Sequence, residues 1–160
     1  MIVREPGVEG DLLLLQWWSI LVEDGELLDV FSEIAETPSG FLGVFTNPNI
    51  AFFYDIDEKG ITKAIWFEPF MGTNVSMGMW CRKDWRHGRW WGDLIDVLGK
   101  MFEHTPMVMF ITKRPHVVES ALRVGFTSMG KMPYAYRGED GYVAYLTREE
   151  YEKKHGKYSR

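Results

Sequence analysis

The chain has 160 residues, a formal net charge of −5 at pH 7 and one cysteine. A chain of this length can bury most of its apolar surface as one unit, so we expect residues 1–160 to form a single domain. The acidic balance argues against a nucleic-acid binder, because affinity for a phosphate backbone needs a broad basic face. One cysteine excludes an internal disulfide and fits a reducing compartment, which makes the cytoplasm the expected location.

The sequence predicts neither membrane insertion nor secretion. Its strongest apolar run, Leu12 to Leu15 with Trp17 to Val22, is interrupted by polar residues and is too short to span a bilayer. No basic segment followed by an apolar stretch and a cleavage site opens the chain. The four histidines lack the spacing of metal ligands, so we expect no metal site.

Two helices are expected in the first 40 residues. Asp11 is the candidate N-cap of the first helix, which Asp24-Gly25 ends. Apolar residues recur at helical spacing from Leu27 to Ile34, and the segment 37–40, Thr-Pro-Ser-Gly, is expected to stop the second helix.

An antiparallel meander should follow, because apolar, aromatic and β-branched runs alternate with turn signals. The expected strands are Phe41–Phe45, Ile50–Ile56, Ile61–Phe70 and Val75–Cys81.

The second half of the chain predicts a strand, helix, strand unit and a closing hairpin. The expected elements are a helix from Arg89 to Glu103, a buried strand from Met107 to Ile111, a short helix from Pro115 to Gly125 and strands at Phe126–Arg137 and Tyr142–Leu146. Strands 75–81 and 107–111 should be parallel, since a helix connects them. The polar tail 148–160 is expected to be helical and frayed.

Four Lys or Arg residues stand among the nine residues from Arg82 to Trp90. They lie where the crossover helix should begin, and cations at that end disfavour the helix because its dipole is already positive there. A bound anion would relieve the conflict, so the segment is a candidate anion site. The alternative is a solvated basic loop whose Arg side chains stack on Trp85, Trp90 and Trp91.

At this turn the chain resembles the GNAT family of N-acetyltransferases. The matching segments, in chain order, are Met79-Trp-Cys-Arg-Lys-Asp-Trp-Arg-His-Gly, the helix after it, Ile111-Thr-Lys-Arg-Pro115 and Ala121-Leu-Arg-Val-Gly-Phe126. The resemblance covers roughly residues 1 to 150. It implies an α/β (α+β) GNAT fold, with a mixed central sheet, an antiparallel N-terminal meander, a parallel βαβ core whose strands splay apart, and a C-terminal hairpin.

The resemblance also implies acetyl-CoA as co-substrate, with the acyl thioester between strands 75–81 and 107–112. The implied cofactor-binding residues are Met79, Trp80, Cys81, Arg86, His87, Gly88, Arg89, Trp90, Trp91 and Thr112. The family's turn reads Arg/Gln-x-x-Gly-x-Gly/Ala, and this chain departs from it with Arg89 and Trp91 at positions where the family has small residues. Cys81 itself has no base partner in the sequence and is interpreted as a strand residue.

The catalytic candidates follow from the same family. Glu68 is the one carboxylate within its expected strand and is the candidate general base, since aromatic neighbours could raise its pKa; the alternative is that Glu68 faces solvent. Ala121 stands where many members have a catalytic Tyr, and Pro115 to Val117 replace a CoA-contacting Asn. His116 or Tyr134 is therefore the candidate proton donor.

The leading hypothesis is a CoA-dependent N-acyltransferase that acts on a small-molecule or protein amine. The alternative is a catalytically degenerate GNAT-like protein, used for binding or assembly with a partner protein or a second copy. Small aromatic-rich chains of this kind look similar to proteins of tailed bacteriophages, which would place the protein in the host cytoplasm or the virion. RNA binding through the Arg/Trp turn is a third reading, which the acidic balance disfavours.

Overall fold

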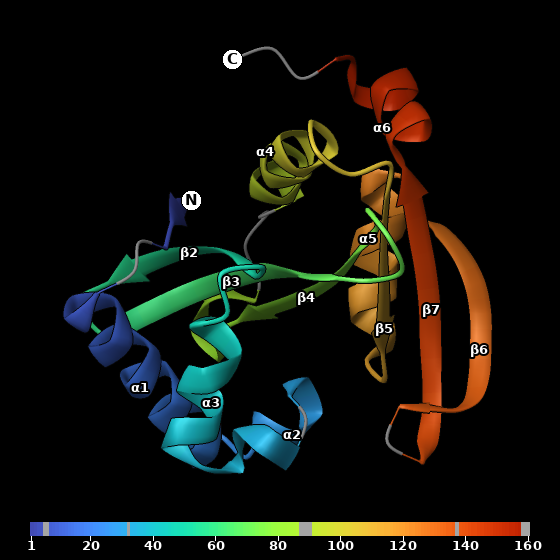
Figure 1. Cartoon of the computed structure of the whole chain (residues 1–160). Coiled ribbons are helices and arrows are strands. Elements are labelled where there is room, and N and C mark those ends of the chain that lie inside the picture. Colours follow the sequence, from blue (N-terminus) through green and yellow to red (C-terminus); the bar gives the residue numbers. More distant parts are fainter. Residues whose placement is uncertain (5–6, 32, 87–90, 137, 158–160) are drawn as a thin grey trace. The chain divides into compact units, whose positions relative to one another are not determined.

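The computed structural model describes residues 1–4, 7–31, 33–86, 91–136 and 138–157. These residues form two compact units: residues 1–68 with 78–88, and residues 69–77 with 89–160, called unit 1 and unit 2. Seven strands hydrogen-bond in the order β1-β2-β3-β4-β5-β7-β6, and β4 contributes residues to both units. The fold is thus the expected mixed α/β arrangement (Figure 1). None of the described helices is long and apolar enough to cross a bilayer.

Unit 1 combines an N-terminal helical segment with an antiparallel meander. Its helices are α1 (Val8–Glu23), α2 (Leu27–Val30), the 3₁₀ helix η1 (Glu33–Glu36) and α3 (Pro38–Phe45), and its strands are β1 (Ile2–Val3), β2 (Ala51–Asp57), β3 (Gly60–Pro69) and part of β4 (Val75–Cys81). β2 is antiparallel to both β1 and β3. The 3₁₀ helix η2 (Lys83–Trp85) follows β4.

Trp17 of α1 organises the core of unit 1. Its ring centroid lies 5.4 to 5.8 Å from six other aromatic rings, those of Phe31, Phe41, Phe45, Phe52, Trp66 and Trp80. These rings come from both the helical segment and the meander, so α1 and α3 cover one face of the strands (Figure 1). Aromatic side chains bury large apolar areas, so this cluster forms the core of unit 1.

Unit 2 contains the rest of the βαβ arrangement and the closing hairpin. Its elements are the start of β4, α4 (Trp91–Phe102), β5 (Met107–Thr112), α5 (Pro115–Val124), β6 (Thr127–Tyr136), β7 (Glu139–Thr147) and α6 (Arg148–His155). β4 and β5 are parallel, with Val75 opposite Val108 and Ser76 opposite Met109. All six residues of β5 pair with β7 on its other side, and β7 pairs with β6.

Sequence signals at α5 are confirmed. Pro115 occupies the first turn, where its missing N–H is not needed, and Gly125 ends the helix with φ of 125°, a conformation that glycine adopts without strain. Upstream, Thr112 Oγ1 accepts a hydrogen bond from the Arg114 backbone N–H at 3.1 Å. The turn between β5 and α5 is therefore built by local hydrogen bonds.

Some expected elements are wrong in type or length. The segment Phe41–Phe45 is helical, because Thr37 is the N-cap of α3, accepting a hydrogen bond from the Gly40 N–H, and Pro38 opens the helix instead of ending the previous one. α2 stops at Val30, short of the expected Ile34. Asp11 lies within the first turn of α1, whose N-cap is Gly7, and pairs with Arg4.

Residues Arg148–His155 of the tail form a helix that packs on the rest of unit 2, whereas a frayed helix was expected, and residues 158–160 lie outside the described part of the chain. Thr147 and Glu150 form a reciprocal capping box at the start of α6. Tyr151 is buried and donates its hydroxyl hydrogen bond to the Ile95 carbonyl at 2.9 Å. Lys154 donates to the Arg123 carbonyl, and the His155 ring lies 2.6 Å from the Val124 carbonyl. The helix thereby ties α4 and the end of α5 together.

The backbone of Gly78 in β4 lies against the Trp66 indole. A Cβ placed there would lie 2.0 to 2.4 Å from three atoms of the Trp66 ring, whereas a Cβ on Gly43 of α3 would meet nothing within 4 Å. Gly78→Ala should therefore displace the Trp66 indole from the aromatic core. We expect a loss of about 1–3 kcal/mol in the free energy of unfolding, measured by urea denaturation.

Gly43→Ala is the matched control. An exposed helical glycine replaced by alanine should gain about 0.5–1 kcal/mol. Equal effects of the two substitutions would contradict the close approach of Gly78 to Trp66.

Candidate functional site

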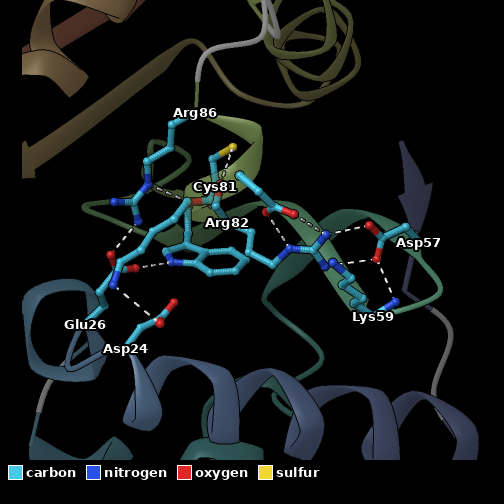
Figure 2. A network of polar contacts seen from close by, with 10 residues as sticks. Asp24, Glu26, Asp57, Lys59, Cys81, Arg82 and Arg86 are labelled. Atoms are coloured by element: carbon cyan, nitrogen blue, oxygen red, sulfur yellow. Dashed lines mark hydrogen bonds and ion pairs between the residues drawn. The ribbon is translucent and has the colours of Figure 1, made fainter.

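The basic segment after β4 lies in a network of ion pairs (Figure 2). Arg82, at 8% exposure, donates to both oxygens of Asp57 at the end of β2 and to both oxygens of Asp84, and its backbone N–H bonds to the Thr62 carbonyl. These contacts fix the end of β4 to the β2–β3 hairpin. Charged hydrogen bonds from Arg82 lower the pKa of Asp57 and of Asp84, and Asp57 in turn raises the pKa of Arg82.

Glu26 pairs with Arg86, the last described residue of the basic segment, and with Trp80 of β4. Its Oε1 accepts from Arg86 Nη2, and its Oε2 accepts from the Trp80 indole N–H at 2.8 Å. The Arg86 Nε also donates to the Cys81 carbonyl at 3.0 Å. Burial raises the pKa of Glu26, but the hydrogen bonds from Arg86 and Trp80 and the charges of Arg86 and Lys83 outweigh it, so the pKa lies below its usual value.

The side chains of the described basic residues are therefore matched by carboxylates distant in sequence. Lys83 completes the pattern with an ion pair to Asp24 at 3.4 Å. Their described partners are acids, and the candidate anion site at this turn stays a prediction. The cations found over Trp85 and Trp91 come from elsewhere, namely Lys63 and Arg123.

Sequence reasoning missed these partners. In the sequence, Asp24 indicates only the end of a helix, and no pattern singles out Glu26 or Asp57. The excess of acidic over basic residues was a signal that the segment could be neutralised internally, but it does not identify which carboxylates do so. That choice depends on tertiary packing.

The predicted cofactor residues divide between the two units. Met79, Trp80 and Cys81 are buried at the end of β4, and Arg86 follows them in unit 1. Trp91 and Thr112 belong to unit 2, where the Trp91 ring lies 5.0 Å from the Arg123 guanidinium of α5. His87, Gly88, Arg89 and Trp90 lie outside the described residues.

Cys81 does not have the properties of a nucleophile. Burial raises the pKa of its thiol to about 11, so the reactive thiolate is scarce at neutral pH. Its Sγ contacts the Arg82 carbonyl at 3.6 Å. These observations agree with the interpretation of Cys81 as a strand residue.

The predicted catalytic residues are all exposed. Glu68 lies near the end of β3, where the side chains of Trp66 and Phe67 are buried and its own carboxylate faces outward. His116 lies in the first turn of α5. Tyr134 of β6 is 79% exposed and has a φ of 57°, which is uncommon for a residue other than glycine. Their roles stay predictions.

Metal binding finds no support in the part of the chain that is described, where no three His, Cys, Asp or Glu side chains gather in a way that could hold an ion.

No protein-family model matches the sequence, and no curated protein is significantly similar to it. Solved structures do resemble the fold. They include ribosomal-protein-S5-alanine acetyltransferase from Vibrio fischeri, with a TM-score of 0.70, 13% identity and 93% of each chain covered. Spermidine N-acetyltransferase from Vibrio cholerae, in complex with CoA and spermine, has a TM-score of 0.68 and 12% identity over 94% of this chain and 96% of the other.

An aminoglycoside 6′-N-acetyltransferase complexed with coenzyme A is similar to the same degree. Its TM-score is 0.68, at 13% identity over 92% of this chain and 97% of the other. The chain therefore has the fold of GNAT acetyltransferases over nearly its whole length, as the sequence predicted.

The Glu26 network gives a prediction for acid stability. The pKa of Glu26 is lowered in the folded state. The contribution of its carboxylate to folding stability is therefore fully present above the ordinary pKa of 4.5 and is lost as the pH falls through the pKa of the folded state. Glu26→Gln should cost roughly 1–3 kcal/mol at pH 7, the size of a charged hydrogen bond. The difference from wild type in unfolding free energy should shrink as the pH falls from 6 to 3, measured by urea denaturation at each pH.

Glu58→Gln, in the exposed β2–β3 turn, is the matched control and should change stability by less than about 0.5 kcal/mol at any pH. A Glu26→Gln penalty that is independent of pH would contradict the charged role of Glu26.

Proposed function

We propose that this protein is a CoA-dependent N-acyltransferase that transfers an acetyl group from acetyl-CoA to an amine. The observation that carries the proposal is the match of nearly the whole chain to acetyltransferases, two of which are described with CoA bound. The three are named as acetyltransferases of ribosomal-protein-S5 alanine, of spermidine and of aminoglycosides. A small-molecule or protein amine is therefore the substrate class to test.

The turn between β4 and α4 is the proposed pyrophosphate site. Arg86, His87, Gly88 and Arg89 would bind there, with the backbone N–H groups at the start of the helix as donors. Arg86 already donates to Glu26 and to the Cys81 carbonyl, so Arg89 is the proposed second cation for the phosphates. The Trp91 ring, which replaces a small residue, has a partner in Arg123 of α5.

The thioester would lie along β4 and β5, beside Thr112, as the family resemblance implies. Among the described residues, β4 and β5 pair in parallel through two residues of each strand, whereas β5 pairs with β7 along its whole length.

The reaction needs one proton acceptor and one proton donor. The amine nitrogen attacks the thioester carbonyl, a C–N bond forms, the C–S bond breaks, and CoA leaves as a thiolate. Glu68 is the proposed base that takes the proton from the amine, and His116 or Tyr134 the proposed acid that protonates the thiolate. Positioning of the two substrates supplies most of the rate, since the thioester is already activated.

Acetyl-CoA should raise the thermal stability of the protein, because a ligand that binds only the folded state stabilises it. At one hundred times the dissociation constant the gain is about 2.7 kcal/mol, which is several degrees in Tm. Arg89→Ala should weaken binding about tenfold through loss of a charged phosphate contact, measured by calorimetry.

Lys153→Ala, on an exposed position of α6, is the matched control and should bind acetyl-CoA as the wild type does. No stabilisation by millimolar acetyl-CoA or CoA would refute the proposal and favour the binding or assembly alternative.

Glu68→Gln should lower kcat by roughly 10² to 10⁴ while leaving the affinity for acetyl-CoA unchanged, as expected for loss of a general base. Release of CoA thiol in the presence of spermidine, an aminoglycoside or an N-terminal alanine peptide measures the rate. Glu119→Gln, an exposed carboxylate of α5, serves as the control. Activity of Glu68→Gln equal to that of the control would exclude Glu68 as the base.

A further inference from the structure

β6 is the last strand of the sheet, since it pairs with β7 on one side and with no described strand on the other. The strand at the opposite end, β1, is two residues long, whereas β6 has ten. Figure 1 shows β6 beyond β7 at the margin of unit 2. A long edge strand presents a row of backbone N–H and C=O groups to which another chain can pair, so an edge of this length needs protection.

No other part of the described chain covers β6. Residues 127–134 are all exposed, so both faces of this part of the strand are open. Large apolar side chains stand among them, those of Met129, Met132 and Tyr134. Exposed apolar side chains on a free edge favour association with a second strand. Protection of this edge therefore has to come from β6 itself and from the neighbouring strand.

The backbone of β6 is irregular at two places. β6 advances two residues, from Ser128 to Gly130, where β7 advances one. It then advances four residues, from Met132 to Tyr136, where β7 advances two. Each interruption contains a residue in the left-handed conformation, Gly130 with a φ of 84° and Tyr134 with a φ of 57°. Extra residues of this kind bend and twist a strand, so the outer edge of β6 departs from the flat geometry that favours pairing.

The same interruptions remove hydrogen-bond donors from the edge. The Gly130 N–H donates to the Ser128 hydroxyl at 3.1 Å. The Tyr134 N–H donates to the carboxylate of Asp140 in β7. Pro133 has no N–H to offer. Three of the five backbone positions from 130 to 134 therefore provide no donor for an incoming strand.

A charged side chain stands in the same stretch. Lys131 is 58% exposed and pairs with Asp140 at 2.9 Å. A second strand laid along the edge would take the ammonium group partly out of water, which is unfavourable. Asp140 also accepts the N–H of Tyr134, so one carboxylate of β7 contacts both the lysine and the left-handed residue.

We propose that segment 130–134 keeps the edge of β6 unpaired, so that neither a second copy of this chain nor another protein adds a strand there. Strand addition depends on main-chain hydrogen bonds along an extended edge, and this segment lacks donors and is not regularly extended. The proposal does not depend on acyl transfer. It restricts the assembly alternative, because a partner protein would have to bind in another way.

An opened-edge variant that combines Ser128→Ala, Pro133→Val and Asp140→Ala tests the proposal. It frees the N–H groups of Gly130 and Tyr134 and adds one at position 133. Its mass in analytical ultracentrifugation should rise with protein concentration to about twice the wild-type value or more, as strands pair edge to edge. The β6 amides should then exchange with solvent more slowly. In the wild type, β6 amide exchange should not depend on concentration.

Two further variants identify the surface responsible. Met129→Lys with Met132→Lys, added to the opened-edge variant, should restore the wild-type mass, because each lysine places a charge on the edge. Asp96→Ala, which removes an exposed carboxylate of α4, is the matched control and should sediment as the wild type does.

Three results would contradict the proposal. The first is an opened-edge variant that is folded by circular dichroism and keeps the wild-type mass at every concentration. The second is association that leaves the β6 amides unprotected or that the two lysines do not reverse, since the contact would then lie elsewhere. The third is concentration-dependent protection of β6 in the wild type, which decides the matter even where the opened-edge variant does not fold.

Discussion

The hydrogen bond from the Trp80 indole to Glu26 is the interaction that joins the aromatic core of unit 1 to the polar turn after β4. Trp80 lies in the aromatic core around Trp17, and Arg86 lies outside that core. Glu26 accepts a hydrogen bond from each of them and so connects the two. Aromatic packing alone is not directional enough to orient a polar turn, whereas a hydrogen bond between a buried donor and a charged acceptor is. The core of unit 1 and the turn after β4 therefore form one cooperative structure.

Internal neutralisation changes how the basic turn is understood. Arg82, Lys83 and Arg86 are each matched by a carboxylate, so their charges stabilise the fold instead of creating an open positive surface. An anion at this turn would depend on backbone N–H groups and on Arg89, and binding would be local and geometric. Such a site suits a pyrophosphate group better than an extended polyanion, which needs many free cations.

Sequence reasoning succeeded where strong local signals agreed with the tertiary structure. The apolar face from Trp91 to Phe102, the buried run of β5, and the Pro115 and Gly125 signals gave the βαβ arrangement correctly. It failed for the five-residue apolar run Phe41–Phe45, because a short run fits a strand or a buried helix equally well. α6 was also underestimated, since a polar helix is stabilised mainly by partners elsewhere in the chain, such as the carbonyl that Tyr151 reaches.

The sequence by itself determined the order of strands and helices from β2 to β7, the GNAT-type fold, and the turn after β4 as its most basic segment, because periodicity, turn residues and charge runs are local properties of the chain. Only the tertiary structure decided what those charges do. Asp57 is 25 residues from Arg82, and Glu26 is 60 residues from Arg86, and only the packing of α1 and the meander around Trp17 brings these pairs into contact. Ion pairs between such distant residues follow from the fold, and no spacing rule in the sequence selects them.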